Sequence, residues 1–134
     1  MRSNLKIEKI DYRVNEEKRT VACILTCNMQ LRKHPAFDMH FYYQWKKRMP
    51  KVDYNGEFTV SATAKCNEDD TFDVEVGKRI AESRAKQKAF GIARRVYVEV
   101  FNEVVGAAGL IRLSIDACAN AFDVEEKHIE ELIG

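Results

Sequence analysis

Residues 65–105 constrain the fold most, because they join the end of a strand to one long helix. After Lys65 and Cys66 comes an acidic loop over residues 67–70, and Asp73 is then suited to cap a helix. Beyond it, apolar side chains recur at the three- and four-residue spacing of one helical face: Ile80, Ala81, Ala85, Ala89, Ile92, Val96, Val100 and Val104. The spacing predicts a long helix over residues 73–105, and its small alanines allow close packing on a sheet or on another helix.

Three segments of the N-terminal half alternate between apolar and other side chains with a period of two. They cover residues 21–29, 39–45 and 58–66, and the sequence Asn55-Gly56 before the last is a strong turn signal. Such alternation is typical of strands that bury one face. We therefore predict three strands from these segments.

A further strand is expected upstream, but its apolar pattern changes phase. Leu5 and Ile7 set one phase, whereas Ile10, Tyr12 and Val14 set the other. A one-residue slip of this kind indicates a β-bulge or two short strands. A hairpin turn is expected over residues 15–18.

The C-terminal part of the chain reads as two shorter helices. Gly106 and Gly109 are expected to end the long helix, and a shorter apolar helix follows over residues 110–121. Asp123 and Glu126 then have the spacing of a capping box for a last helix that ends at Gly134. Strands followed by helices predict an α+β fold. It would have an antiparallel sheet of about four strands (residues 1–66), packed by one long helix (residues 73–105) and a helical hairpin (residues 110–134).

Composition places the chain among ordinary soluble proteins. The 134 residues suit a single domain, with 46% hydrophobic and 32% charged residues. A net charge of +1 excludes neither nucleic-acid nor protein partners, because a balanced total can hide local patches. No uninterrupted apolar run approaches the ~20 residues of a membrane span, and the start has no apolar signal region. Four cysteines without a secretory signal favour reduced thiols and a cytosolic location.

A row of cations lies on one flank of the predicted long helix. At 100° per residue, Gly77, Arg84, Lys88, Gly91 and Arg95 share a narrow sector beside the apolar face. These cations either extend to solvent and pair with strand carboxylates, or line a pocket for phosphate or carboxylate. In the second interpretation Arg84, Lys88 and Arg95 hold the anion, for which the forked guanidinium is well suited. The two interpretations carry similar weight.

A second basic cluster follows the aromatic strand. It comprises Lys46, Lys47, Arg48 and Lys51, and it comes directly after an aromatic run that includes Tyr42 and Trp45. Cations beside aromatic rings can hold a nucleotide or nucleic acid through phosphate contacts and base stacking. A solvated loop after a core strand is the more common outcome for such a pattern.

Catalytic and metal-binding patterns have little support in the sequence. The carboxylates of Asp69, Asp70 and Asp73 lack the spacing of a calcium loop, and capping and solubility explain them more simply. Cys23 and Cys27 share one strand face, and the three histidines have no zinc-ligand spacing to them. There is no glycine-rich phosphate loop and no recognisable nucleophile with its base. We therefore expect a protein that is not an enzyme and has no metal and no cofactor.

The tail of the chain has the apolar spacing of a helix-turn-helix. Its would-be recognition helix, however, carries Glu125, Glu126, Glu130 and Glu131, whose charges would repel phosphates. A structural helical hairpin or an oligomer contact is the preferred interpretation, and a homo-oligomer is expected.

Two stretches of the sequence resemble a group of known proteins. The run from Ala64 to Asp73 (AKCNEDDTFD) and the run from Gly77 to Lys86 (GKRIAESRAK) are similar to small uncharacterised proteins of phages, prophages and mobile elements. The resemblance covers about a quarter of the chain and implies no specific activity. Phage accessory proteins of this size and strand-then-helix plan include oligomeric anti-defence proteins that sequester cyclic nucleotide signals, as in the Thoeris group. The likeness to those is one of architecture only, and no ligand residue is transferred.

The order of three strands and a helix with a basic start also resembles a double-stranded-RNA-binding domain. The glycine-rich approach to the second helix of that domain is missing, and the acidic loop stands where cations would be needed.

Three functions follow as hypotheses. The first is a phage or mobile-element accessory protein in the host cytosol that binds a small anionic, nucleotide-like ligand. In it, Arg84, Lys88 and Arg95 hold phosphates beside Gly91, and Trp45 or Tyr42 stacks on a base. The second is an inhibitor of a host protein that acts through its helices and residues 46–51, and the third is a nucleic-acid-binding module.

Overall fold

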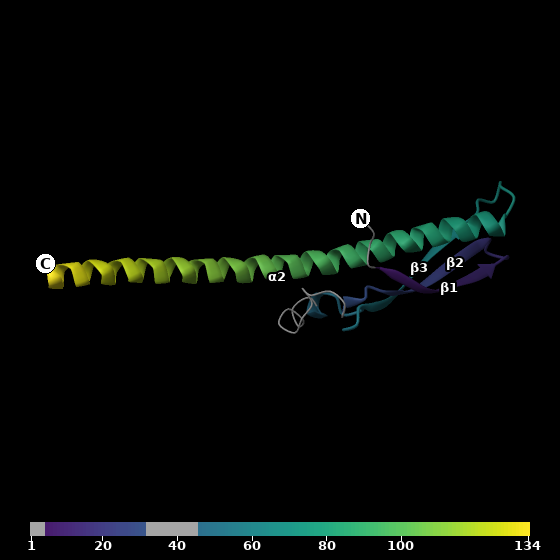
Figure 1. Cartoon of the computed structure of the whole chain (residues 1–134). Coiled ribbons are helices and arrows are strands. Elements are labelled where there is room, and N and C mark those ends of the chain that lie inside the picture. The colour runs from purple at the N-terminus through teal and green to yellow at the C-terminus, as the bar shows by residue number, and fades with distance from the viewer. Residues whose placement is uncertain (1–4, 32–45) are drawn as a thin grey trace. The chain divides into compact units, whose positions relative to one another are not determined.

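The computed structural model describes residues 5–31 and 46–134 (Figure 1). By contacts between Cα atoms the chain divides into two units, Met1–Val100 and Phe101–Gly134. The α+β class predicted from the sequence is confirmed. Its elements are β1 (Lys6–Asn15), β2 (Thr20–Asn28), β3 (Glu57–Lys65) and α2 (Val74–Ile133), in that order.

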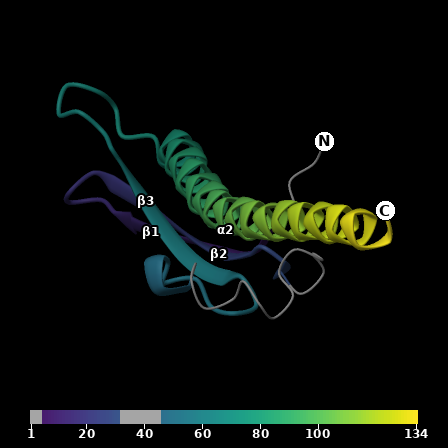
Figure 2. The same ribbon diagram turned by 90° about the vertical axis from the view of Figure 1, so that its left-hand side faces the viewer.

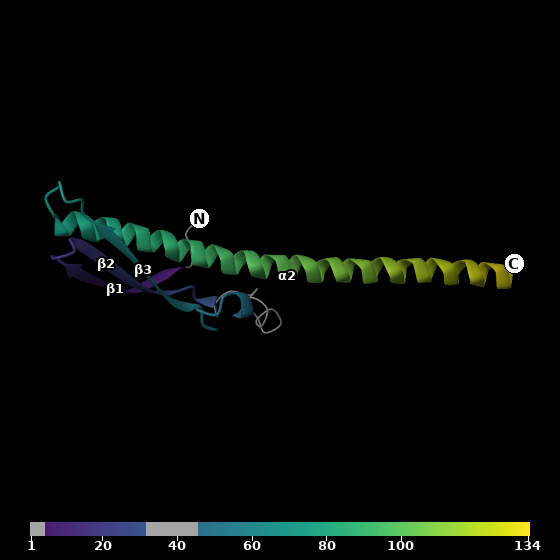
Figure 3. The same cartoon turned by 180° about the vertical axis from the view of Figure 1, so that it is seen from behind.

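The three strands form one antiparallel sheet in the order β1-β2-β3. Ile10 of β1 lies opposite Leu25 of β2, and Leu25 lies opposite Val60 of β3. The register of β1 shifts between Ile7 and Lys9, which is the bulge expected from the phase change in its apolar pattern. Figures 2 and 3 show the sheet with the first part of α2 over one of its faces.

The core of the first unit lies between this sheet and the first part of α2. Strand β2 supplies its centre, because every second residue from Val21 to Cys27 is fully buried. Alanines at four-residue intervals, from Ala81 to Ala93, face it from α2, and Val96 and Val100 continue the same face. The small residues therefore serve the predicted role of close packing. Burial raises the pKa of the Cys23 and Cys27 thiols, which lie in this core.

Local contacts fix the start of β3 and the start of α2. Gly56, in the turn before β3, has a φ of +89°, and a Cβ at this position would lie 2.8 Å from Leu31 Cγ. Only glycine adopts this conformation at little cost, so the turn predicted at Asn55-Gly56 is confirmed. At the start of α2, Asp73 accepts hydrogen bonds from the backbone N–H groups of Glu75 (3.0 Å) and Val76 (3.3 Å), which confirms the predicted helix cap.

Two predictions about the elements are wrong in detail. The described sheet has three strands rather than about four, and the alternating run at residues 39–45 lies outside the described residues. The two shorter C-terminal helices are not separate, because α2 continues through Gly106, Gly109 and Asp123 to Ile133. Each glycine costs a helix only ~1 kcal/mol relative to alanine. The good helix formers around them outweigh that cost.

Candidate ligand-binding site

A pocket of about 310 Å³ in the first unit brings together the two basic clusters seen in the sequence. Its wall combines residues 48–52, the start of β3 and one stretch of α2. Arg48 and Lys51 come from the second basic cluster, and Arg95 comes from the helical row of cations. These clusters are separate in the sequence, and only the folded chain brings residues 48–51 close to the helix.

The floor of this pocket is apolar. Val52 and Phe58 are almost fully buried beneath it, and Ile92 of α2 packs against the same core. Backbone contacts fix the loop that carries the cations: the N–H of Val52 donates to Met49 O (3.2 Å), and the N–H of Asp53 donates to Glu57 O (2.9 Å). Three cations over an apolar floor suit a ligand that has an anionic group and a flat apolar part.

The cations of the pocket and its loop differ in how they are engaged. Arg48 forms an ion pair with Glu99 of α2. Lys46 donates to Pro50 O (2.7 Å), and its Nζ lies 5.7 Å from the centre of the Tyr54 ring, so it serves the loop itself. Lys51 and Arg95 have no hydrogen bond or ion pair with any part of the chain that the structure describes. These two side chains are therefore available to an anion.

Two of the three cations assigned to the ligand from the sequence contact the edge of the sheet instead. Arg84 Nη1 donates to Thr63 O (2.9 Å), and Lys88 Nζ donates to Ser61 O (2.8 Å). Thr63 and Ser61 are alternate residues of β3, which is an edge strand among the described residues, and their outward carbonyls have no neighbour in the described sheet. Arg84 and Lys88 thus donate hydrogen bonds to the outward carbonyls of β3, and neither lines the 310 Å³ pocket.

The remaining residues of the sequence-predicted site take separate places. Gly91 is exposed, and a Cβ there would meet no atom within 4 Å. Gly77, in the same helical row, instead brings the start of α2 against β2, because a Cβ would lie 2.8 Å from Val21 Cγ2. Lys47 is exposed in the short helical turn of residues 46–48 and does not line the pocket. Tyr42 and Trp45, proposed to stack on a base, lie outside the described residues.

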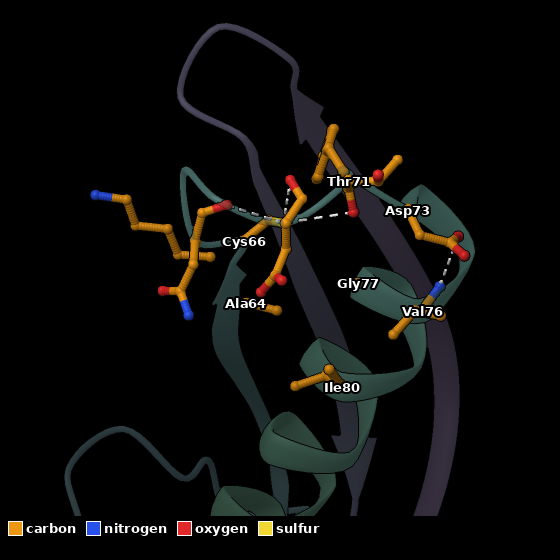
Figure 4. Close-up of a pocket in the computed structure, with 11 residues that line it drawn as sticks. Ala64, Cys66, Thr71, Asp73, Val76, Gly77 and Ile80 are labelled. Carbon is orange, nitrogen blue, oxygen red and sulfur yellow. Dashed lines mark hydrogen bonds between the residues drawn. The ribbon is translucent and has the colours of Figure 1, made fainter.

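A second hollow, of about 280 Å³, lies at the connection between β3 and α2 (Figure 4). Arg19, which precedes β2, organises this connection by donating to the backbone oxygens of Glu68 (2.9 Å) and Asp70. Cys66, at the start of this connection, is also bound to Arg19, because its N–H donates to Arg19 O (2.9 Å). The acidic loop is thus held through its backbone. Sequence reasoning missed Arg19, and its position directly before a strand carries no signal of this role.

Within residues 5–31 and 46–134, no group of three or more His, Cys, Asp or Glu side chains is arranged to hold a metal ion. An 18-residue window of α2 has a mean hydropathy of 1.3 and no buried residue, so by length and composition alone this helix can cross a membrane.

Comparison with protein-family models, with curated proteins and with solved structures finds no match to this chain.

Proposed function

We propose that this protein is a non-enzymatic binding protein that holds a small anionic, nucleotide-like ligand in the pocket lined by Arg48, Lys51 and Arg95. The observation that carries the proposal is the meeting of Lys51 and Arg95, neither of them engaged by described residues, over the apolar floor of Val52, Phe58 and Ile92.

The cations and the apolar floor contact different parts of the ligand. Arg95 and Lys51 hold a phosphate group by charge-assisted hydrogen bonds, which contribute about 1.5–3 kcal/mol each when formed to charged groups. Arg48 forms part of the wall, and its charge is largely offset by Glu99. Ile92, the partly exposed member of the apolar floor, contacts the face of a base or a similar ring, because Val52 and Phe58 are almost fully buried. A protein that binds such a ligand without converting it acts by sequestration, as do the anti-defence proteins whose strand-then-helix architecture is similar.

Calorimetric titration with linear and cyclic mono- and dinucleotides, and with inorganic pyrophosphate, tests this site. Arg95→Glu is expected to raise the dissociation constant at least tenfold, because it replaces an attractive charge by a repulsive one. Arg94→Glu is the matched control, since Arg94 is the neighbouring exposed helix cation and does not line the pocket. It should change the dissociation constant by less than about twofold. An unmodified protein that binds none of these compounds, or equal losses in the two variants, would refute the proposal.

The pyrophosphate arm separates the two parts of the pocket. A nucleotide is expected to bind more tightly than pyrophosphate because only the nucleotide covers the apolar floor. Equal affinities would show that the floor takes no part in binding.

A further inference from the structure

The second unit, Phe101–Gly134, is a helical segment whose large apolar side chains lie open. Phe101, Phe122 and Leu132 expose 65%, 70% and 83% of their surfaces, and no described residue is buried in this unit. Soluble monomers rarely expose contiguous apolar surface on this scale. We therefore expect another molecule to cover the apolar surface of this segment.

The spacing of these side chains identifies the kind of occupant. One row of the helix is found by stepping alternately three and four residues from Phe101 to Leu132. All of its positions are apolar except Glu125. The row comprises Phe101, Val104, Ala108, Ile111, Ile115, Cys118, Phe122, Glu125, Ile129 and Leu132. We call this row the heptad stripe. Its large members are Phe101, Ile111, Ile115, Phe122, Ile129 and Leu132. A sustained period of 3.5 residues keeps a stripe facing another helix as the two wind around each other.

The size of the heptad stripe matches what a stable dimer needs. An aromatic side chain buries about 150–250 Å² when fully covered. If isoleucine and leucine have areas of a similar order, each of the six large members exposes on the order of 100 Å² that a partner could cover. The resulting area, on the order of 600 Å² per copy before the smaller members are added, compares with about 800 Å² per partner in a standard interface.

A bilayer fits the same segment less well than a helix does. Arg112 and Asp116, paired at 3.9 Å, lie in the middle of its most apolar part, where charges are costly to insert in lipid. Several carboxylates then follow from Asp123 to Glu131. The charged residues of this segment, apart from Glu125, all lie outside the row, and a row with a 3.5-residue period is typical of a helix–helix contact.

Glu125 indicates how the two helices are oriented. In a parallel, in-register pair it would face its own counterpart within the contact, and two like charges there are destabilising. In an antiparallel pair with Ile115 opposite Cys118, Glu125 faces the small Ala108. Arg112, one turn beyond Ala108, then lies within reach of that carboxylate. The same register sets Phe101 opposite Leu132 and Val104 opposite Ile129, so every stripe position has a partner.

We propose that residues 101–132 pair, through the heptad stripe, with the same segment of a second copy of this chain in antiparallel orientation. The pairing uses none of the residues assigned to the ligand pocket. The two proposals therefore stand or fall separately.

The mass of the full-length protein in solution tests the pairing. Sedimentation equilibrium is expected to show a dimer, and Ile115→Glu is expected to weaken it at least 100-fold. Leu113→Glu is the matched control, because Leu113 is similarly exposed (65% against 59%) but lies on the opposite face of the helix. It should change the dimer constant by less than about threefold. Circular dichroism confirms that both variants remain helical.

Crosslinking tests the orientation. In a background with Cys66→Ser and Cys118→Ser, chains carrying Val104→Cys and chains carrying Ile129→Cys are oxidised separately and as a mixture. An antiparallel pair gives a disulfide-linked dimer only in the mixture, whereas a parallel pair gives it in each variant alone. Crosslinks in each variant alone overturn the antiparallel orientation. A monomeric full-length protein, equal effects of the two glutamate variants, or flotation with phosphatidylcholine vesicles overturns the proposal itself.

Discussion

At the residue scale, two glycines in the same row of the helix have different surroundings. Gly77 and Gly91 both fall in the row of cations identified from the sequence. Gly77 lies against Val21 of the core, whereas Gly91 faces open space. The sequence pattern placed both correctly beside the apolar face. It contained no information on which one the sheet would approach, because that depends on where β2 crosses the helix.

Alanine substitutions at these two glycines separate packing from helix propensity. Gly77→Ala is expected to lower the free energy of unfolding by about 1–2 kcal/mol, because the new Cβ would press on a buried, β-branched side chain. Gly91→Ala is expected to raise it by about 0.5–1 kcal/mol, since alanine is the better helix former and meets no neighbour. Urea denaturation measures both, and a stabilising Gly77→Ala would contradict the close approach.

At the element scale, the flanks of α2 hold both edges of the sheet. On the side of β3, Arg84 and Lys88 donate to strand carbonyls. On the side of β1, the Tyr12 hydroxyl donates to Glu82 (3.0 Å), and this hydrogen bond to a carboxylate raises the pKa of Tyr12. The row of cations was predictable from helical spacing. Its use at a sheet edge was not, because backbone carbonyls leave no trace in the sequence.

Removing the two edge donors is expected to weaken the first unit modestly. The double variant Arg84→Ala, Lys88→Ala should lower the free energy of unfolding by about 1–2 kcal/mol, since each lost hydrogen bond contributes about 0.5–1.5 kcal/mol and water partly replaces it at this exposed edge. Arg94→Ala, which removes an exposed cation without such a contact, should stay within about 0.5 kcal/mol. Chemical denaturation would contradict this role if the double variant matched the control.

The boundaries of the elements show where sequence reasoning fails. The strands at residues 21–29 and 58–66 were predicted within one residue, because period-two alternation and a glycine turn act locally. The helix breaks at Gly106–Gly109 and at Asp123 were wrong, since a glycine or a capping residue permits an end without requiring one.

At the scale of the whole molecule, the buried core and the exposed apolar surface belong to different units. Every buried apolar side chain among the described residues lies between Val21 and Val100, whereas the large apolar side chains beyond Val100 are exposed. The stability of the first unit is therefore expected to come from its own core, and that of the second from association. The sequence contained both apolar patterns, but their helical spacing alone does not distinguish a core face from a contact face.

Removal of residues 104–134 tests this division. The shortened chain keeps the entire described core, so we expect it to unfold cooperatively, within about 1 kcal/mol of the Ile115→Glu full-length protein. Its melting temperature should not depend on protein concentration. The melting temperature of the unmodified chain should rise with concentration, because mass action stabilises an associated state. Differential scanning calorimetry at several concentrations measures both. A shortened chain without a cooperative transition would show that the sheet depends on the second unit, because its own core would then be too small to fold alone.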